Sequence, residues 1–333
     1  MSGKAQAGRV GELLPPARLH PAVLHWVDKK SGRDAWTVAF SGGADSLALL
    51  LLLWAHWPKR REKLLALHFN HRLRGRESAA DEKFCRRVCA ALGVRLRVGR
   101  WRGARKDASE AEARMARHLF FAEEMKRRRS RVLWLAHQQD DIAESMLMRL
   151  ARGSGTGGLA APRPVLVLGD GRTHLRPLLT LKKSELLAAL RRAGVKWRED
   201  SSNVRGDFFR NRIRGRVLPA WIKAAGRDAL AGAALSRERL EEDEQALEAW
   251  VEVLAPLDRA KRLNLRALAG MPRAVTRRAL HRWLLTQMQP TDLSRQGFEV
   301  LLAAVERGRP TRFSLGAHGF AVIGSDKLSF RKG

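Results

Sequence analysis

The chain has 333 residues, of which 45% are hydrophobic, so it can bury a sizeable core, and we expect two domains. Its 64 Lys and Arg outnumber its 34 Asp and Glu, and the net charge of +30 predicts attraction to a polyanion. Nucleic acid is the first candidate for this partner, and an anionic membrane is the second. The longest apolar run, residues 47–54, is too short to span a bilayer, and residues 1–20 lack the apolar core of a signal peptide, so we expect a cytoplasmic protein.

The stretch from residue 37 to residue 50 has the pattern of a strand, a glycine-containing turn and a leucine-rich helix. Its two glycines permit backbone conformations that a side chain would forbid, and they let an anion approach closely. The free N–H groups and the dipole of the following helix favour negative charge. We therefore predict a phosphate-binding loop with serine hydroxyls at its edges. Its residues are Ser41, Gly42, Gly43, Ala44, Asp45 and Ser46.

Asp45 distinguishes this loop from the GxxxxGK[ST] loop, in which a lysine follows the glycines. A carboxylate beside a polyphosphate is repulsive unless a cation lies between them, so we infer a bound Mg²⁺ that Asp45 helps to hold. The alternative is an ordinary turn in which Asp45 only complements the helix dipole.

Short apolar runs alternate with longer amphipathic segments through the first part of the chain. This alternation predicts right-handed βαβ crossovers and an α/β fold, in which helices cover both faces of a parallel sheet. In such sheets ligands bind at the carboxyl ends of the strands, where the loop at 41–46 is expected. The predicted strands are 37–40, 64–69, 94–98 and 132–136, and the predicted helices are 78–92, 108–129 and 181–193.

Cys85 and Cys89 are the two cysteines of the chain, and they share one face of a predicted helix with Phe84, Val88 and Leu92. We interpret them as buried core thiols. Two cysteines at this spacing do not complete a zinc or iron–sulfur site, and no histidine lies at the expected ligand spacing.

Basic side chains follow the second strand and begin the next long helix. Arg74 would open onto the crevice of the phosphate loop, or lie in a solvated loop. Ser109 and Glu112 form the pattern of a capping box. Arg114 and Arg117 then share a helix face suited to phosphate, although pairing with acidic neighbours or exposure to water stays open.

Asp141 and Glu144 lie on one face of a helix that begins after the strand at 132–136. Acidic residues often cap a helix without further function, but these lie at the crevice end of a strand. The glycine-rich segment 152–159 follows, and we expect either a mobile loop over the site or a plain linker.

The second half is rich in arginine and asparagine beside aromatic residues, which suits a phosphate backbone with unstacked bases, although a surface helix is the alternative. We expect one long helix over residues 223–252, with its acidic part facing away from the polyanion. From residue 256 we expect helices and then a small hairpin. Three arginines there are predicted to be available for phosphates: Arg277, Arg278 and Arg282.

Several motifs occur in an order that resembles one enzyme family. SGGADS resembles the pyrophosphate loop of the N-type ATP pyrophosphatases, the PP-loop superfamily, which cleave ATP between its α and β phosphates. Together with HFNHRLR, EARMAR, DDIAE before RGSGTGGL, RPLL, and REDSSN before RNRIR, it resembles the tRNA(Ile)-lysidine synthases over roughly residues 35–330. The resemblance implies a Rossmann-like PP-loop catalytic domain at 1–220, a linker helix at 221–255 and a smaller, mainly helical tRNA-binding domain at 256–333.

The resemblance also implies a reaction, in which ATP and Mg²⁺ serve to convert the wobble cytidine of a CAU anticodon in tRNA(Ile) to lysidine. The cytosine C2 oxygen would attack the α-phosphate of ATP, pyrophosphate would leave, and the ε-amine of free lysine would displace AMP. The implied catalytic residues are Asp45, Arg114, Asp141 and Glu144, with Asp45 and Asp141 also as metal ligands. The implied tRNA-binding residues are Arg74, Arg205, Arg210, Asn211, Arg212 and Arg214.

The chain departs from the family pattern in three ways. His137-Gln138 stands where the family often has two adjacent histidines, and Arg117-His118 stands in place of Arg-Tyr. It also resembles the short form of the family, without an additional C-terminal domain. The oligomeric state is open, a homodimer included. The alternative functions are a sulfur-inserting tRNA modifier of the same superfamily and a non-catalytic RNA-binding protein.

Overall fold

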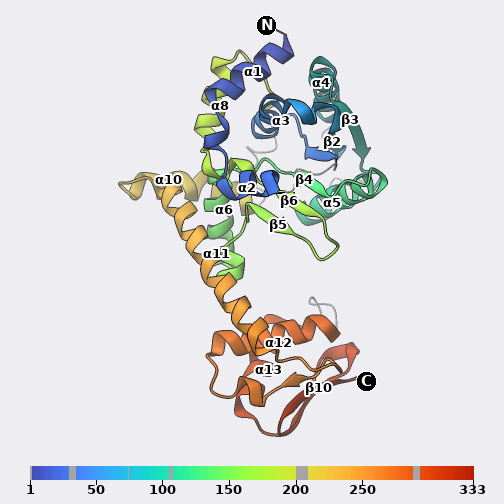
Figure 1. Cartoon of the computed structure of the whole chain (residues 1–333), viewed down its shortest axis with the longest axis vertical. Coiled ribbons are helices and arrows are strands. Elements are labelled where there is room, and N and C mark those ends of the chain that lie inside the picture. The colour runs from blue at the N-terminus through green and yellow to red at the C-terminus, as the bar shows by residue number, and fades with distance from the viewer. Residues whose placement is uncertain are drawn as a thin grey trace. The chain divides into compact units, whose positions relative to one another are not determined.

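A computed structural model describes residues 2–29, 35–73, 75–103, 105, 108–199, 209–287 and 293–333. The chain divides into two compact units, Met1–Leu240 and Glu241–Gly333 (Figure 1). Arg74 and Arg205, two of the predicted tRNA-binding residues, lie outside the described residues. Among the described helices, none is both long and apolar enough to cross a membrane.

A six-stranded sheet with the order β3-β2-β1-β4-β6-β5 forms the centre of the first unit. Neighbouring strands are parallel except for β5, which pairs with β6 as an antiparallel hairpin at one edge. The predicted α/β fold with a parallel sheet is therefore confirmed, with one antiparallel edge strand in addition. The strands are β1 (Trp36–Ala39), β2 (Leu64–Asn70), β3 (Arg95–Arg100), β4 (Val132–Trp134), β5 (Val165–Val167) and β6 (Thr173–Leu175).

Helices cover both faces of this sheet. Successive side chains of a strand point to opposite faces, so each buried strand presents apolar side chains to the helices on both sides. In β2, Leu64 and Ala66 pack in the core cluster that contains α3 and α4, whereas Leu65 and Leu67 pack with Phe121 of α5. The helices of this unit are α1 (Gly3–Leu13), α2 (Pro21–Lys29), α3 (Ala44–His56), α4 (Arg76–Leu92), α5 (Glu110–Arg127), α6 (Gln139–Leu150), α7 (Thr156–Leu159), α8 (Lys183–Arg192), α9 (Phe209–Arg212) and α10 (Leu218–Ala224).

α3 is enclosed on all sides, and residues 47–54 are each at most 7% exposed. A helix that is apolar all round is stable only when other elements cover it. α1 and α8 pack on α3 from the side opposite the sheet (Figure 1). The loop that precedes α3 is therefore attached to the most enclosed helix of the unit.

The strand order reverses at β1. From β1 the chain adds β2 and β3 on one side, and it then returns to add β4 on the other side. The loops that follow β1 and β4 diverge at such a point and leave a crevice at the carboxyl ends of the strands. The loop at 41–46 and the start of α6 both open at this edge of the sheet.

Two segments differ from the sequence-based expectation. The glycine-rich segment 152–159 ends in the short helix α7, and Arg149 Nη1 of α6 donates to Gly158 O (2.6 Å), so part of this segment is packed structure. The single helix expected at 223–252 is two helices, α10 and α11 (Ala229–Leu254). Between them Gly226 adopts a left-handed φ of 61°, a conformation that glycine accepts at little cost and that commonly ends a helix.

The second unit combines the C-terminal part of α11 and the helices α12 and α13 with a four-stranded antiparallel sheet of order β7-β10-β9-β8. The expected hairpin is present as β9 and β10, and two further strands extend it on either side. The elements are α12 (Arg273–Gln287), α13 (Arg295–Arg307), β7 (Leu263–Asn264), β8 (Thr311–Ser314), β9 (Phe320–Ile323) and β10 (Lys327–Arg331).

The arginines of α12 are paired with carboxylates of their own unit. Arg278 binds Glu244 of α11, and Arg282 Nη2 lies 2.6 Å from Glu248 Oε2 on the same helix. Arg277 lies 3.5 Å from a carboxylate of α13. The prediction that these arginines are available for phosphates is therefore corrected, because the acidic part of α11 and α13 already neutralise them.

Candidate functional site

Two serines stabilise the conformation of the loop between β1 and α3. Ser41 Oγ lies 2.9 Å from Ser46 Oγ, and Ser46 Oγ donates to Gly43 O (3.0 Å). Gly42 has a left-handed φ of 92°, whereas Gly43, the N-cap of α3, has an extended backbone with φ −71°. These contacts fix a tight turn at the N-terminus of α3, where free N–H groups and the helix dipole favour an anion.

Gly42→Ala is expected to lower the free energy of unfolding by about 1–2 kcal/mol, and Gly43→Ala by less than about 0.5 kcal/mol. A Cβ on Gly42 would lie 3.1 Å from Cys85 Sγ in a left-handed backbone, whereas a Cβ on Gly43 meets nothing closer than Ser41 Oγ at 3.5 Å. Urea denaturation of both variants measures the difference. Equal stabilities would contradict the requirement for a left-handed residue at position 42.

Arg198 contacts the loop from the segment that follows α8, and the sequence analysis gave it no role. Its backbone N donates to Gly42 O (3.0 Å), and its Nε donates to Asp81 Oδ1 of α4 (2.8 Å). Arg198 is the first residue of the REDSSN motif, and this motif is the feature of the sequence that could have pointed to it. Arg198 therefore fastens the glycine turn to α4.

Asp45 lies in the first turn of α3, and its Oδ1 is buried and has no hydrogen-bond partner among the residues that the structure describes. Burial raises the pKa of Asp45 to about 6; Lys183 and Arg214 lower it, while Asp141 and Asp140 raise it. Charged side chains from three separate segments therefore lie within electrostatic reach of this carboxylate. A buried acceptor without a donor is costly unless a ligand completes it.

The surroundings of Asp45 fit a divalent cation that is shared with a phosphate ligand. Mg²⁺ prefers oxygen ligands, and it is commonly held by one or two carboxylates plus the phosphates of a substrate. Within the residues that the structure describes, no group of three or more His, Cys, Asp or Glu forms a metal site by itself. A single carboxylate such as Asp45 can hold Mg²⁺ together with phosphate oxygens and water.

The raised pKa of Asp45 predicts a pH dependence of folding. The folded protein holds the Asp45 proton more tightly than the unfolded chain, so stability should fall as pH rises from about 4 to about 6. Asp45→Asn removes this effect, so without metal or nucleotide the variant should gain about 2 kcal/mol relative to the parent between pH 4 and pH 7. Urea denaturation in EDTA across that range measures the gap. A gap that stays constant with pH would contradict the prediction.

Asp141 and Glu144, one turn apart on α6, are buried and bind two arginines. Arg210 Nη2 donates to Asp141 Oδ1 (2.6 Å), and Arg210 Nε donates to Glu144 Oε2 (2.9 Å). Arg214 Nε donates to Glu144 Oε1 (2.6 Å). Burial alone would lower the pKa of both arginines, but attraction to the two carboxylates raises it. Two of the residues predicted for catalysis thus form one cluster with two of those predicted for tRNA binding.

The departure at Gln138 has a structural role. Gln138 is the N-cap of α6: its Oε1 accepts from Asp140 N (2.5 Å), and its backbone N donates to Asp141 Oδ2 (3.1 Å). The neighbouring His137 accepts at Nδ1 from Arg176 Nε (3.2 Å). Burial and the adjacent Arg176 hold the pKa of His137 well below its usual range, so this ring is neutral.

Arg114 lies on α5 in a group of cationic side chains. Arg176, which directly follows β6, is buried, and burial together with repulsion from Arg114 lowers the pKa of Arg176 to about 10. Its guanidinium donates to His137 and to Arg163 O (2.7 Å), and no carboxylate contacts it among the described residues. His118, at the position of the family's tyrosine, stacks on His174 of β6 with ring centroids 6.4 Å apart. This concentration of positive charge suits a phosphate.

The remaining predicted tRNA-binding residues lie on α9, beside the arginines of the cluster. Arg212 is exposed, and its guanidinium lies 5.8 Å from the ring centroid of Phe209. Asn211 is half-buried on the same helix. Arg214 follows in a π-helical turn, Ile213–Val217, a geometry that often occurs at functional sites.

Comparison with known proteins gives consistent matches. Residues 18–221 match the family model described as the PP-loop domain. The chain is 37% identical to the tRNA(Ile)-lysidine synthase of Pseudomonas syringae pv. tomato, over 89% of this chain and 67% of that protein. It is 32% identical to that of Geobacillus kaustophilus over 91% and 68%, and 33% identical to that of Bacillus subtilis over 82% and 60%. The chain thus spans about 60% to two thirds of the length of these relatives.

The fold is also similar to a solved structure. The U34-tRNA thiolase NcsA from Methanococcus maripaludis, with its 4Fe-4S cluster, aligns with a TM-score of 0.52 at 17% identity. The alignment covers 71% of this chain and 78% of that chain. At this identity the likeness concerns the fold alone.

Proposed function

Because the chain belongs to the PP-loop family and, within it, to the tRNA(Ile)-lysidine synthases, we propose that it uses ATP to join free lysine to the wobble cytidine of tRNA(Ile). In the first step the cytosine C2 oxygen attacks the α-phosphate of ATP, and pyrophosphate leaves. In the second step the ε-amine of lysine attacks C2 and AMP leaves with the oxygen. The products are lysidine, AMP and pyrophosphate.

The phosphate loop supports the first step. Ser41 and the N-terminus of α3 would bind the pyrophosphate part of ATP through hydroxyl and backbone donors, and Ser46 would brace the loop through Gly43 O. Asp45 would hold Mg²⁺ together with phosphate oxygens, and the ion would neutralise charge on the leaving group. The buried Oδ1 of Asp45, which has no hydrogen-bond partner among the described residues, is the single observation that carries this assignment.

The cluster of Asp141 and Glu144 supports the second step. Both carboxylates already bind cationic groups, since Arg210 and Arg214 donate four hydrogen bonds of 2.6–2.9 Å to them. The ammonium of lysine has the same charge and needs acceptors to orient it. These carboxylates would position the amine, and one of them would accept its proton.

The cationic group around Arg114 would stabilise the negative charge that develops on the α-phosphate. Arg114 and Arg176 come from α5 and from the end of β6, so they approach the crevice from separate elements. Arg114 is exposed and Arg176 is buried, and guanidinium groups directed at a transferring phosphoryl group stabilise its developing charge. Arg212 and Asn211 on α9 would contact the tRNA.

Sulfur insertion into tRNA is a weaker candidate. Such chemistry on a cluster needs accessible thiolates, and the two cysteines of the chain, Cys85 and Cys89, are at most 1% exposed in the core. Burial raises the pKa of Cys89 to about 12 and that of Cys85 still higher, so neither is a ready ligand or nucleophile.

The proposed function is tested by incubating the protein with ATP, MgCl₂, labelled lysine and total tRNA. We expect label in tRNA only when ATP is present, and a lysidine nucleoside after digestion. Label that never enters tRNA would refute lysidine formation. Release of pyrophosphate that requires tRNA but not lysine would support an adenylated intermediate.

A further inference from the structure

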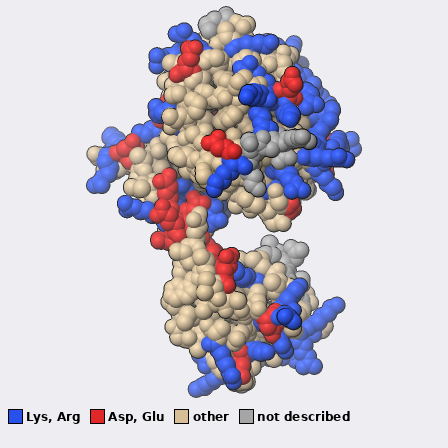
Figure 2. Space-filling view, in the orientation of Figure 1, with Lys and Arg blue, Asp and Glu red and all other residues tan. Residues whose placement is uncertain are grey.

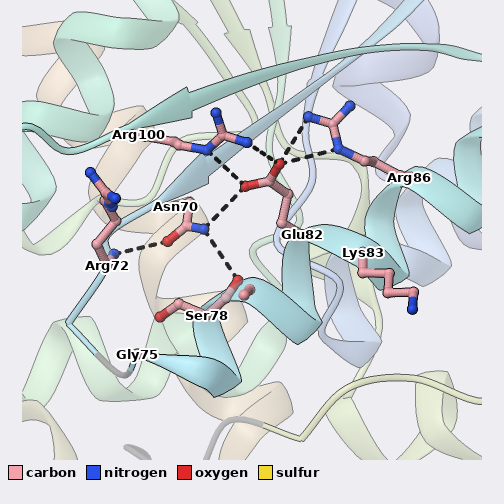
Figure 3. A pocket seen from close by; sticks show the side chains of 9 residues that line it. Asn70, Arg72, Gly75, Ser78, Glu82, Lys83, Arg86 and Arg100 are labelled. Atoms are coloured by element: carbon pink, nitrogen blue, oxygen red, sulfur yellow. Dashed lines mark hydrogen bonds and ion pairs between the residues drawn. The ribbon is translucent and has the colours of Figure 1, made fainter.

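A pocket of about 540 Å³ lies beside the carboxyl ends of β2 and β3 and is distinct from the phosphate loop. Figure 3 shows it from close by, with cationic side chains from the loop after β2, from α4 and from β3 around it. Its lining contains four cations and one carboxylate, and none of residues 41–46. The charged lining residues are Arg72, Lys83, Arg86, Arg100 and Glu82.

Glu82 organises two of these cations. It is 7% exposed, and its Oε1 accepts from Arg100 Nη2 (2.7 Å) and from Arg86 Nη2 (2.9 Å). Asn70 Nδ2 donates to its Oε2 (3.2 Å). Burial would raise the pKa of Glu82, but the hydrogen bonds from Arg100, Arg86 and Asn70 lower it to about 2. The carboxylate therefore stays ionised and fixes two guanidinium groups side by side.

The two guanidinium groups stay accessible while Glu82 does not. The side chains of Arg86 and Arg100 are 53% and 56% exposed, whereas that of Glu82 is 10% exposed. Their Nη1 groups make no hydrogen bond with the described residues, and Lys83 is exposed beside them. With four positive charges and one negative charge, the lining keeps a positive excess that a bound anion would neutralise.

Arg72, the cation that follows β2 in the lining, has a strained backbone. It has a left-handed φ of 58°, and Asn70 Oδ1 holds it there by accepting from Arg72 N (2.9 Å). A side chain other than Gly, Asn or Asp pays about 1 kcal/mol for this conformation. The same Asn70 that braces Glu82 thus also directs Arg72 to the pocket (Figure 3).

The elements that line the pocket lie on a side of the first unit that is rich in Lys and Arg. Figure 2 shows Lys and Arg gathered on the side where Figure 1 places α4, β3 and α5. Arg95 and Arg97 are exposed on the edge strand β3, where charge also protects the edge from pairing with another chain. Edge protection explains those two residues. It does not explain a pocket whose cations come from the loop after β2, from α4 and from β3, and in which Arg86 and Arg100 share one buried carboxylate.

We propose that this pocket binds a phosphodiester of the substrate RNA, so that the first unit grips the RNA backbone beside the catalytic crevice. The proposal rests on the proposed function for the identity of the RNA. Paired guanidinium groups and an ammonium bind phosphate oxygens with both charge and hydrogen bonds. Phosphate contacts of this kind fix the register of an RNA without reading its sequence.

Binding of tRNA to a double variant, Lys83→Gln with Arg86→Gln, tests the proposal. Glu82 keeps Arg100 and Asn70 as partners in this variant, so the fold should persist. Each lost contact with a single-stranded phosphate should reduce the slope of log K against log salt by about 0.7, or about 1.4 for two. At about 0.1 M salt, a slope that is smaller by about 1.4 corresponds to a roughly twentyfold lower affinity of the variant for tRNA, compared with the parent protein. The matched control, Lys4→Gln with Arg9→Gln, removes two exposed charges from α1.

Three outcomes of the binding measurements support or overturn the proposal. A smaller slope in the pocket variant and an unchanged slope in the control would support the proposal. Equal slopes in the parent and the pocket variant would overturn it, while lysine transfer by the parent protein still decides the proposed function separately. Weaker ATP binding by the pocket variant with unchanged tRNA binding would assign the pocket to a free nucleotide and would also overturn it. The exposed single variant Lys83→Glu repeats the test if the double variant is unstable.

Discussion

Asp45→Asn is expected to lower the rate of tRNA-dependent pyrophosphate release by about a thousandfold and to leave tRNA affinity unchanged. The amide has the same shape as the carboxylate, so it fits the first turn of α3. It has no negative charge to hold a cation against the phosphates, and one of its two terminal atoms is a donor. The orphaned Oδ1 would then present either a neutral oxygen or an N–H to the ligand.

Asp170→Asn is a suitable control for this variant, because it makes the same chemical change at an exposed turn where Asp170 pairs with Arg172. Its rate should stay within about twofold of the parent, as is usual for exposed positions away from a site. The two measurements are the rate of pyrophosphate release with ATP, MgCl₂ and tRNA, and the Kd for tRNA. An Asp45→Asn protein with the parent's rate would refute the metal role of this residue. A parallel loss of tRNA affinity would assign Asp45 to RNA binding instead.

Glu144→Gln should separate the two half-reactions. We expect lysine incorporation to fall by about a hundredfold at fixed lysine concentration, while tRNA-dependent pyrophosphate release continues. Glu144 is 1% exposed and accepts from both Arg210 and Arg214, so its charge is the centre of the cluster. A neutral amide would attract the lysine ammonium less strongly. It would also leave two arginines short of a counter-charge, at a cost of about 3 kcal/mol in stability.

Loss of stability and loss of lysine binding must be told apart in this experiment. Glu124→Gln is the matched control, because Glu124 is also a buried carboxylate paired with an arginine, Arg127 at 2.9 Å, but on α5. It should lose stability without a change in the KM for lysine. Partial rescue of Glu144→Gln at high lysine would support a binding role. Equal loss of both half-reactions would instead place Glu144 in the activation of ATP.

The conformation of the loop at 41–46 could be predicted from sequence because its determinants are local. Two glycines between a strand and a leucine-rich helix predict a turn that a side chain would forbid, and Gly42 adopts a left-handed φ just before α3. The capping box from Ser109 to Glu112 was predicted for the same reason, and it is confirmed. The buried face of Cys85 and Cys89 followed from helical periodicity and is also confirmed.

The carboxylate cluster could not be predicted, because its partners are distant in sequence. Arg210 and Asp141 are 69 residues apart, and Arg198 and Asp81, which brace the loop, are 117 residues apart. Each residue alone has an ordinary solvated alternative, and only the fold brings the pairs together. The strand β5 was missed because three residues at a sheet edge carry little periodic signal. The arginines of α12 were misjudged because their carboxylate partners are on other helices.

α1 has a practical consequence for any shortened version of this protein. It lies before residue 18, where the match to the family model begins, yet Ala7 and Val10 are completely buried against α3. A fragment trimmed to 18–221 would uncover a row of leucines on the helix that carries the phosphate loop. Contiguous apolar surface of this kind promotes aggregation. Poor yield from such a fragment would therefore reflect a missing cover and not a defective catalytic centre.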